Sequence, residues 1–69
     1  MRNKFAERLK NILKEKEMSQ SELARRINIS PSVVNNYCSG KKEPTLDTLY
    51  SICETLPESA DYLLGLKDE

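Results

Sequence analysis

Three polar side chains in the middle of the chain, Ser32, Asn35 and Asn36, carry closely spaced hydrogen-bonding groups. In a helix from about Pro31 to Cys38 they share one side, with Val33 at its margin, because successive residues turn by about 100°. The amide of Asn36 presents a donor and an acceptor together, the pattern that pairs with N6 and N7 of an adenine. A serine hydroxyl bonds to several bases, and a valine methyl can contact a thymine methyl group. The segment therefore has the groups needed to read base edges.

A helix that merely faces solvent would show the same polar side. The composition of the whole chain helps to decide between a base-reading surface and a solvated one. The chain of 69 residues has no His, two Cys without a CxxC pair, and two Gly. These counts argue against a metal site and a phosphate-binding glycine loop, so we expect no cofactor, no metal and no catalysis. Cys38 and Cys53 are expected to be reduced, buried thiols.

The charges are unevenly distributed although the formal net charge is zero. Residues 1–42 carry ten Lys or Arg against four Asp or Glu, whereas residues 43–69 carry one against seven. The formal net charge is therefore +6 for the first part and −6 for the second. This asymmetry favours one basic working face and an acidic remainder.

The length of the chain is that of one domain, which we expect to span residues 1–69. No apolar run approaches the roughly 18 residues of a membrane-spanning helix. The N-terminus also lacks the apolar stretch of a signal peptide, so we expect a cytoplasmic protein.

Apolar residues that recur at helical spacing predict a first helix over about residues 3–16. They are Phe5, Leu9, Ile12 and Leu13, and Arg8 is among the residues expected on the opposite side.

A capping box predicts the start of a second helix, over about residues 20–27. Ser19 is followed three residues later by Glu22, so that each side chain can bond to the other's backbone N–H. Met18 and Leu23 flank this pair at the spacing of a hydrophobic staple.

Only two residues separate the second helix from the next start signal. Asn28 tolerates the left-handed conformation that closes a helix. Ser30 can cap the third helix, and Pro31 suits its first position, where no amide donor is needed. The small Ala24 allows the two helices to cross closely. Two short helices joined by so tight a turn form a helix-turn-helix.

Two further helices are predicted in the C-terminal part. Thr45 caps a fourth helix that ends before Pro57, and Ser59 caps a short fifth one. Their inward faces are expected to consist of Leu46, Leu49, Ile52, Cys53 and Leu56 in the fourth helix, and of Tyr62, Leu63 and Leu66 in the fifth. The predicted fold class is all-α with five helices.

The string MSQSELARRINIS, followed by NYCSGKKEPTLDTL and SADYLLGL, resembles the Xre-type helix-turn-helix family of phage repressors, Cro proteins and bacterial regulators. The resemblance extends from about Phe5 to Leu66. It implies a lambda-repressor-like domain that binds double-stranded DNA, usually as a dimer on a palindromic operator, with the third helix in the major groove. The base-reading residues would then be Ser32, Val33, Asn35 and Asn36.

Contacts to the DNA sugar-phosphate backbone are expected on either side of this base-reading helix. The resemblance implies that Gln20, in the first turn of the second helix, grips a phosphate, and a helix N-terminus itself favours an anion. The segment from Ser39 to Lys42, which includes Gly40, should lie over the sugar-phosphate chain, although a merely solvated turn is the alternative. The expected phosphate contacts are Gln20, Ser30, Ser39, Lys41, Lys42 and Thr45, which position a protein without reading sequence.

Two features depart from the family pattern. Pro31 stands where family members often carry Gln or Arg, so direct readout there is lost and DNA shape should matter more. Leu13 and Cys38 stand where the family commonly has an Arg and a Glu that form an ion pair. Because both partners are replaced, no charge is left unpaired. We predict that these two side chains touch in the core; a redox switch at Cys38 is the alternative.

These patterns together predict a transcriptional regulator, a repressor, that binds its operator as a homodimer. The dimer surface is expected in the acidic C-terminal part, at Leu56, Tyr62, Leu64 and Leu66. The alternative function is a protein-interaction module of the same fold, an antitoxin-like or coactivator-like partner. Such a module would expose an apolar face on the third helix.

Overall fold

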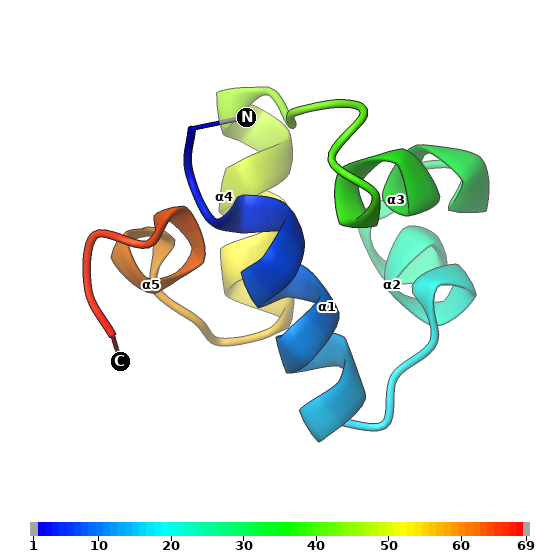
Figure 1. The fold of residues 1–69 in the computed structure, drawn as a ribbon. Coiled ribbons are helices and arrows are strands. Elements are labelled where there is room, and N and C mark those ends of the chain that lie inside the picture. Colours follow the sequence, from blue (N-terminus) through cyan, green and yellow to red (C-terminus); the bar gives the residue numbers. More distant parts are fainter. Residues whose placement is uncertain (1, 69) are drawn as a thin grey trace.

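The computed structural model of the protein describes residues 2–68 and contains five α-helices and no strand within that range (Figure 1). The helices are α1 (Phe5–Glu15), α2 (Gln20–Ile27), α3 (Pro31–Cys38), α4 (Leu46–Thr55) and α5 (Ala60–Leu64). In Figure 1, α1 lies in the middle, with α2 and α3 to one side and α5 to the other. The predicted all-α, five-helix fold is confirmed. None of these helices has the length and apolar composition needed to cross a membrane.

One apolar core receives side chains from all five helices. The rings of Phe5 and Tyr37 meet edge to face, with their centroids 6.0 Å apart and their planes at 75°, and join α1 to α3. Complete burial of an aliphatic or aromatic side chain is worth about 1.5–3 kcal/mol, so this core is the main source of stability. Its buried members are Phe5, Leu9, Ile12, Leu13, Leu23, Ala24, Val34, Tyr37, Cys38, Ile52, Leu56 and Leu63.

The predicted start of α2 is confirmed, although only half of the capping box forms. Ser19 Oγ accepts a hydrogen bond from the backbone N–H of Glu22 at 3.0 Å. The Glu22 carboxylate does not reach back; its Oε2 instead accepts from Arg26 Nη2 at 2.7 Å, one turn further along the helix. An i,i+4 pair of opposite charges offers Glu22 a partner on its own helix.

The turn between α2 and α3 has the predicted backbone but not the predicted cap. Asn28 adopts φ 62° and ψ 44°, the left-handed conformation, and ends α2. Ser30 stands at the N-cap of α3 with an extended backbone and Pro31 follows at the start of the helix, but the Ser30 side chain makes no capping hydrogen bond. Its hydroxyl is instead 3.0 Å from that of Ser32. Pro31 lacks an N–H, so the first turn of α3 has one fewer donor to satisfy.

The predictions for α1 need two corrections. The helix begins at Phe5 and not at residue 3, because Asn3 Oδ1 accepts the Phe5 N–H at 3.0 Å and stays outside the helix. Arg8, expected to face solvent, is only 8% exposed. Its Nη1 donates to the carbonyls of Tyr62 (3.2 Å) and Lys67 (3.0 Å), and its guanidinium lies 4.3 Å from the centre of the Tyr62 ring. Arg8 therefore fastens the C-terminal segment to α1.

The two C-terminal helices also differ from expectation in which side chains they bury. Leu46, at the first position of α4, is 84% exposed, and Leu66, which lies beyond α5, is 74% exposed. Both stand at helix ends, where no neighbouring helix covers them. Leu56 is completely buried, so it belongs to the core and cannot serve the expected dimer surface. Cys53 is half-buried rather than buried.

Replacement of Arg8 should destabilise the fold far more than an equivalent change on the exposed side of α1. We expect Arg8→Met to lower the free energy of unfolding by about 2–3 kcal/mol, because it removes two hydrogen bonds from a charged donor and the contact of the guanidinium with the Tyr62 ring. Urea denaturation measures the change. Lys14→Met is the matched control and should change stability by less than about 0.5 kcal/mol. Equal stability of the two variants would contradict this role of Arg8.

Leu13 and Cys38 both belong to the buried core, on two helices that pack together. Their direct contact stays a prediction, which substitution of Cys38 can test. We expect Cys38→Glu to lower the melting temperature strongly, because it buries one carboxylate while Leu13 stands where the family has the pairing Arg, and an unmatched buried charge costs about 3–5 kcal/mol. Cys38→Ala, which removes volume without adding charge, should cost less. Thermal unfolding followed by circular dichroism compares the two, and an unchanged melting temperature for Cys38→Glu would disprove the interpretation.

Candidate nucleic-acid interface

The four predicted base-reading residues lie together on the outer side of α3. Ser32 and Asn35 are exposed, and Asn36 is half-buried. Val33 is also half-buried and packs against the core, so only part of its side chain is available to a partner. This orientation follows from the opposite side of the helix, where Val34, Tyr37 and Cys38 are buried.

Two hydrogen bonds orient the polar side chains of this surface. The hydroxyls of Ser30 and Ser32 are 3.0 Å apart across the start of α3. Asn35 Nδ2 donates to Gln20 Oε1 at 3.2 Å, so a predicted base-reading residue is held by a predicted phosphate contact from the neighbouring helix. Because the two residues lie on α2 and α3, this bond depends on how the helices cross.

The segment after α3 is shaped by the carbonyl group of Asn36. This oxygen accepts from the N–H of Lys41 at 2.9 Å and of Lys42 at 3.3 Å, and also from the hydroxyl of Ser39 at 3.2 Å. Gly40 allows the reversal because its φ of 80° lies in the left-handed region. The two lysines are exposed. The structure thus ties three of the predicted phosphate contacts to the end of α3.

Thr45 is placed differently from the other predicted phosphate contacts. It caps α4, as predicted, with Oγ1 accepting the Thr48 N–H at 3.2 Å. Its hydroxyl also donates to Thr48 Oγ1 at 3.0 Å, so the side chain already has two local partners. The start of α4 keeps free backbone N–H groups and a positive helix-dipole end, which favour an anion without help from the Thr45 hydroxyl.

Both thiols are in environments that favour the neutral form. Burial raises the pKa of the Cys38 thiol, against the opposing effects of the Lys10 charge and a hydrogen bond with the Gln20 side chain. Burial also raises the pKa of the Cys53 thiol, and the negative charge of Glu58 adds to the effect. Because the thiolate is the reactive species, neither environment favours redox chemistry.

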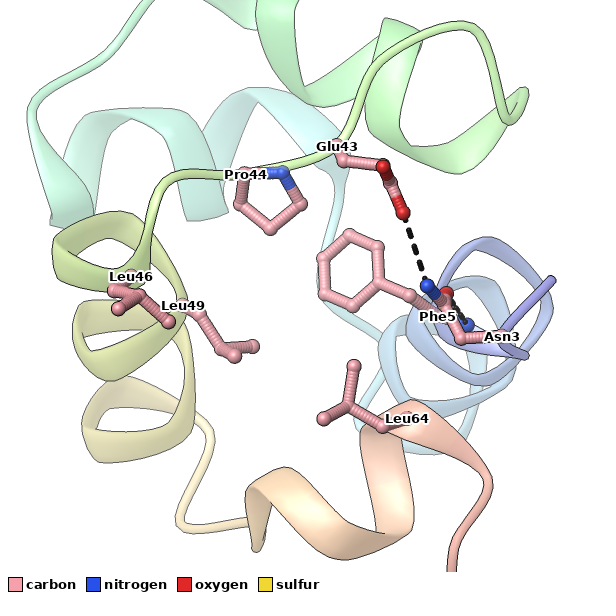
Figure 2. Close-up of a pocket in the computed structure, with 7 residues that line it drawn as sticks. All are labelled: Asn3, Phe5, Glu43, Pro44, Leu46, Leu49 and Leu64. Carbon is pink, nitrogen blue, oxygen red and sulfur yellow. Dashed lines mark hydrogen bonds between the residues drawn. The ribbon is translucent and has the colours of Figure 1, made fainter. Parts of the chain in front are cut away.

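An apolar hollow of about 220 Å³ is lined in part by Glu43 and Pro44, which follow the two lysines in the chain. Figure 2 shows Leu46, Leu49 and Leu64 around it, with the Phe5 ring and Pro44 beside them. At its rim, Asn3 Nδ2 donates to Glu43 Oε2 at 2.9 Å and joins the N-terminal segment to the loop. Sequence patterns did not indicate this contact, since its partners are 40 positions apart.

The chain is similar in sequence to a protein family and to known bacterial regulators. A family model described as helix-turn-helix matches residues 9–63. The uncharacterised HTH-type transcriptional regulator YobD of Bacillus subtilis is 32% identical over 65 residues, which cover 94% of this chain and 58% of that protein. The chain spans between 50% and 58% of the length of the curated relatives it matches.

Solved structures with the same fold come from regulators and from part of an enzyme. The P22 c2 repressor protein, in complex with a synthetic operator, superposes with a TM-score of 0.83 at 25% identity, over 87% of this chain and 91% of that one. Hydroxypropylphosphonic acid epoxidase from S. wedmorenis superposes with a TM-score of 0.82 at 30% identity, over 90% of this chain. The match covers only 33% of the epoxidase chain, so it concerns one part of that enzyme.

Proposed function

Because the chain belongs to the helix-turn-helix family, we propose that it is a DNA-binding transcriptional regulator of the phage-repressor type. It acts in the cytoplasm as a repressor, and α3 enters the major groove of a palindromic operator. The observation that carries this proposal is the composition of the exposed side of α3. That side offers hydroxyl and amide groups, and the loop after the helix carries two exposed lysines. The relatives' description as transcriptional regulators supports it.

The roles divide according to position. Ser32, Val33, Asn35 and Asn36 contact base edges from α3. The phosphate contacts come from Gln20, Ser30, Ser39, Lys41, Lys42 and the start of α4 at Thr45. Sequence is read by the first group, and the second sets the register of the protein on the duplex. Because Pro31 offers no side-chain donor, readout begins at Ser32.

The main alternative, a protein-interaction module, receives less support from the exposed apolar residues. Among residues 2–68, the large exposed ones are Leu46, Tyr50 and Leu66, which lie on α4 and beyond α5. None is on α3, where such a module would need an apolar docking face. The exposed side of α3 suits a polar, charged partner.

DNA binding should weaken steeply as salt rises, because each lysine that contacts a phosphate releases a bound counterion. With a duplex selected from a randomised pool, we expect the negative slope of log K against log salt to become less steep by about 0.9 per half-site for each of Lys41→Ala and Lys42→Ala. Lys14→Ala removes the same charge from the far end of α1 and should leave the slope unchanged. Fluorescence anisotropy across a salt series provides the measurement. Salt-independent binding, or lysine variants that match the Lys14 control, would refute the phosphate contacts.

The homodimer is proposed to form through the apolar surface of α4 around the hollow of Figure 2. Leu46 is 84% and Tyr50 is 66% exposed, one turn apart on the same helix. Self-association would remove both from water, and a twofold axis there would set two recognition helices about 34 Å apart, one turn of DNA. Of the residues expected from sequence, Leu64 lines the hollow, whereas Tyr62 lies under Arg8 and Leu56 is in the core. Leu66, the fourth of them, is exposed but lies beyond α5 and does not line the hollow, so it is left out of the proposed interface.

We expect Leu46→Gln to shift the protein from dimer to monomer without lowering its melting temperature, since the side chain makes little contact within one chain. Sedimentation equilibrium in the absence of DNA measures the association, and circular dichroism checks the fold. Leu66→Gln is the matched control on the other exposed leucine. A dimer that is dissociated by Leu66→Gln and unaffected by Leu46→Gln would place the interface elsewhere.

A further inference from the structure

We propose that Asn3 holds the Glu43 carboxylate away from Lys41 and Lys42, so that both lysines stay available to DNA phosphates. Asn3 is thereby a positioning residue for the phosphate contacts, although it touches no DNA itself. The inference rests on the proposed function and extends it to the segment before α1, which includes none of the expected DNA contacts. Its basis is the hydrogen bond from Asn3 Nδ2 to Glu43 Oε2, 2.9 Å long, which Figure 2 shows at the rim of the hollow.

Glu43 is the nearest competitor for the two lysines. It follows Lys42 directly in the chain, and the side chains of Lys41, Lys42 and Glu43 are all exposed. A carboxylate so close to a lysine can pair with it, and such a pair has to break before a phosphate takes its place. Neither lysine forms an ion pair with a carboxylate of residues 2–68, because the Glu43 carboxylate lies against Asn3 instead.

Asn3 is itself fixed, which is necessary if it is to hold another side chain. It is half-buried, and its Oδ1 accepts the N–H of the buried Phe5 at 3.0 Å. The NH₂ group is therefore the end of the amide that faces Glu43, and it can only donate. The next residue, Lys4, donates its backbone N–H to the Leu64 carbonyl at 3.2 Å. These bonds connect the amide of Asn3 to the core and to α5.

The segment that carries the lysines is thus held at both ends. At its start, the Asn36 carbonyl accepts from the backbone N–H groups of both lysines. At its end, the Glu43 side chain is bound to Asn3, and Pro44 restricts the backbone of Glu43 to extended conformations. Ordering a mobile segment on binding costs conformational entropy, and a segment that is held in the free protein avoids part of this cost.

Reversal of the hydrogen bond tests the role of Asn3 without a change in net charge. In Asn3→Asp the new side chain can still accept the Phe5 N–H, but two carboxylates face each other and Glu43 is released towards the lysines. In the double variant Asn3→Asp/Glu43→Gln the amide and the carboxylate have exchanged places, so the bond can form again with its donor on the loop. This variant has the formal charge of the wild type, so a recovery cannot come from a change in net charge.

We expect Asn3→Asp to weaken binding to the duplex selected by the wild-type protein by about 2- to 12-fold per half-site, the range that corresponds to the cost of fixing one mobile side chain. The negative slope of log K against log salt should become less steep, as it does in Lys42→Ala, because a lysine paired with Glu43 contributes less to counterion release. The double variant should return both quantities to their wild-type values. Fluorescence anisotropy across a salt series measures them.

Asn11→Asp is the matched control, because it makes the same substitution at an exposed position of α1. It should change neither the affinity nor the slope. Asn3 also lines the hollow, so sedimentation equilibrium has to show the same association for Asn3→Asp and the wild type. Thermal unfolding of each variant checks the fold. A loss of DNA binding that only accompanies a loss of self-association or of folding would overturn the positioning role.

Failure of this inference can be distinguished from failure of the proposed function. If Lys41→Ala and Lys42→Ala leave the salt slope unchanged, the proposed phosphate contacts fail, and the role of Asn3 fails with them. If the lysine variants alter the slope but Asn3→Asp binds like Asn11→Asp, only the positioning role is overturned. The same holds if Asn3→Asp weakens binding and the double variant does not recover.

Discussion

The close crossing of α2 and α3 is the constraint on which the rest of the surface depends. Ala24 is completely buried, and Asn28 turns the chain in the left-handed conformation directly before the next helix begins. A larger side chain at position 24 would push the helices apart, and a β-branched residue at position 28 would resist the turn. Because the crossing is fixed, the Gln20 and Asn35 amides come within hydrogen-bonding distance. The polar side of α3 is thus set by packing on its opposite side.

Tertiary contacts, rather than intrinsic propensity, keep α3 helical. It has eight residues, among them Pro, Ser, Asn and two Val, and isolated helices shorter than about 12–15 residues are marginal even with better formers. The Phe5–Tyr37 ring contact and the burial of Val34 and Cys38 supply what the helix lacks. Ser32 and Asn35 on the outer side are exposed, so the packing of the core places little constraint on which side chains stand there.

Local signals predicted most of the fold, and distant contacts account for what they missed. Ser19, Thr45 and Ser59 cap helices where expected, because a cap involves only residues a few positions apart. Helical spacing assigned Arg8 to solvent, yet carbonyl groups more than 50 positions away cover it. No periodicity in α1 could have indicated that partner.

In the candidate site too, local sequence patterns predicted some features, and contacts between distant residues were missed. The side of α3 on which Ser32 and Asn35 lie follows from the spacing of apolar residues, and the structure agrees with it. The bond between Gln20 and Asn35 joins residues 15 positions apart on two helices, so it could be found only once the crossing was known. Which bases and phosphates these side chains contact stays a prediction, because the identity of a partner depends on groups that lie outside the chain.

Under the proposed function, few side chains of α3 contact bases, and hydrogen bonds that orient them before DNA binds compensate for the small number. Pro31 removes one side-chain donor from the start of α3, so the remaining contacts have to be efficient. Fixing a mobile side chain on binding costs about 0.5–1.5 kcal/mol, and a side chain already held in the free protein avoids part of this loss. Ser32 and Asn35 are both held in this way, by Ser30 and by Gln20. The neutral net charge would also favour specific binding, because an acidic C-terminal part weakens electrostatic attachment to DNA of other sequences.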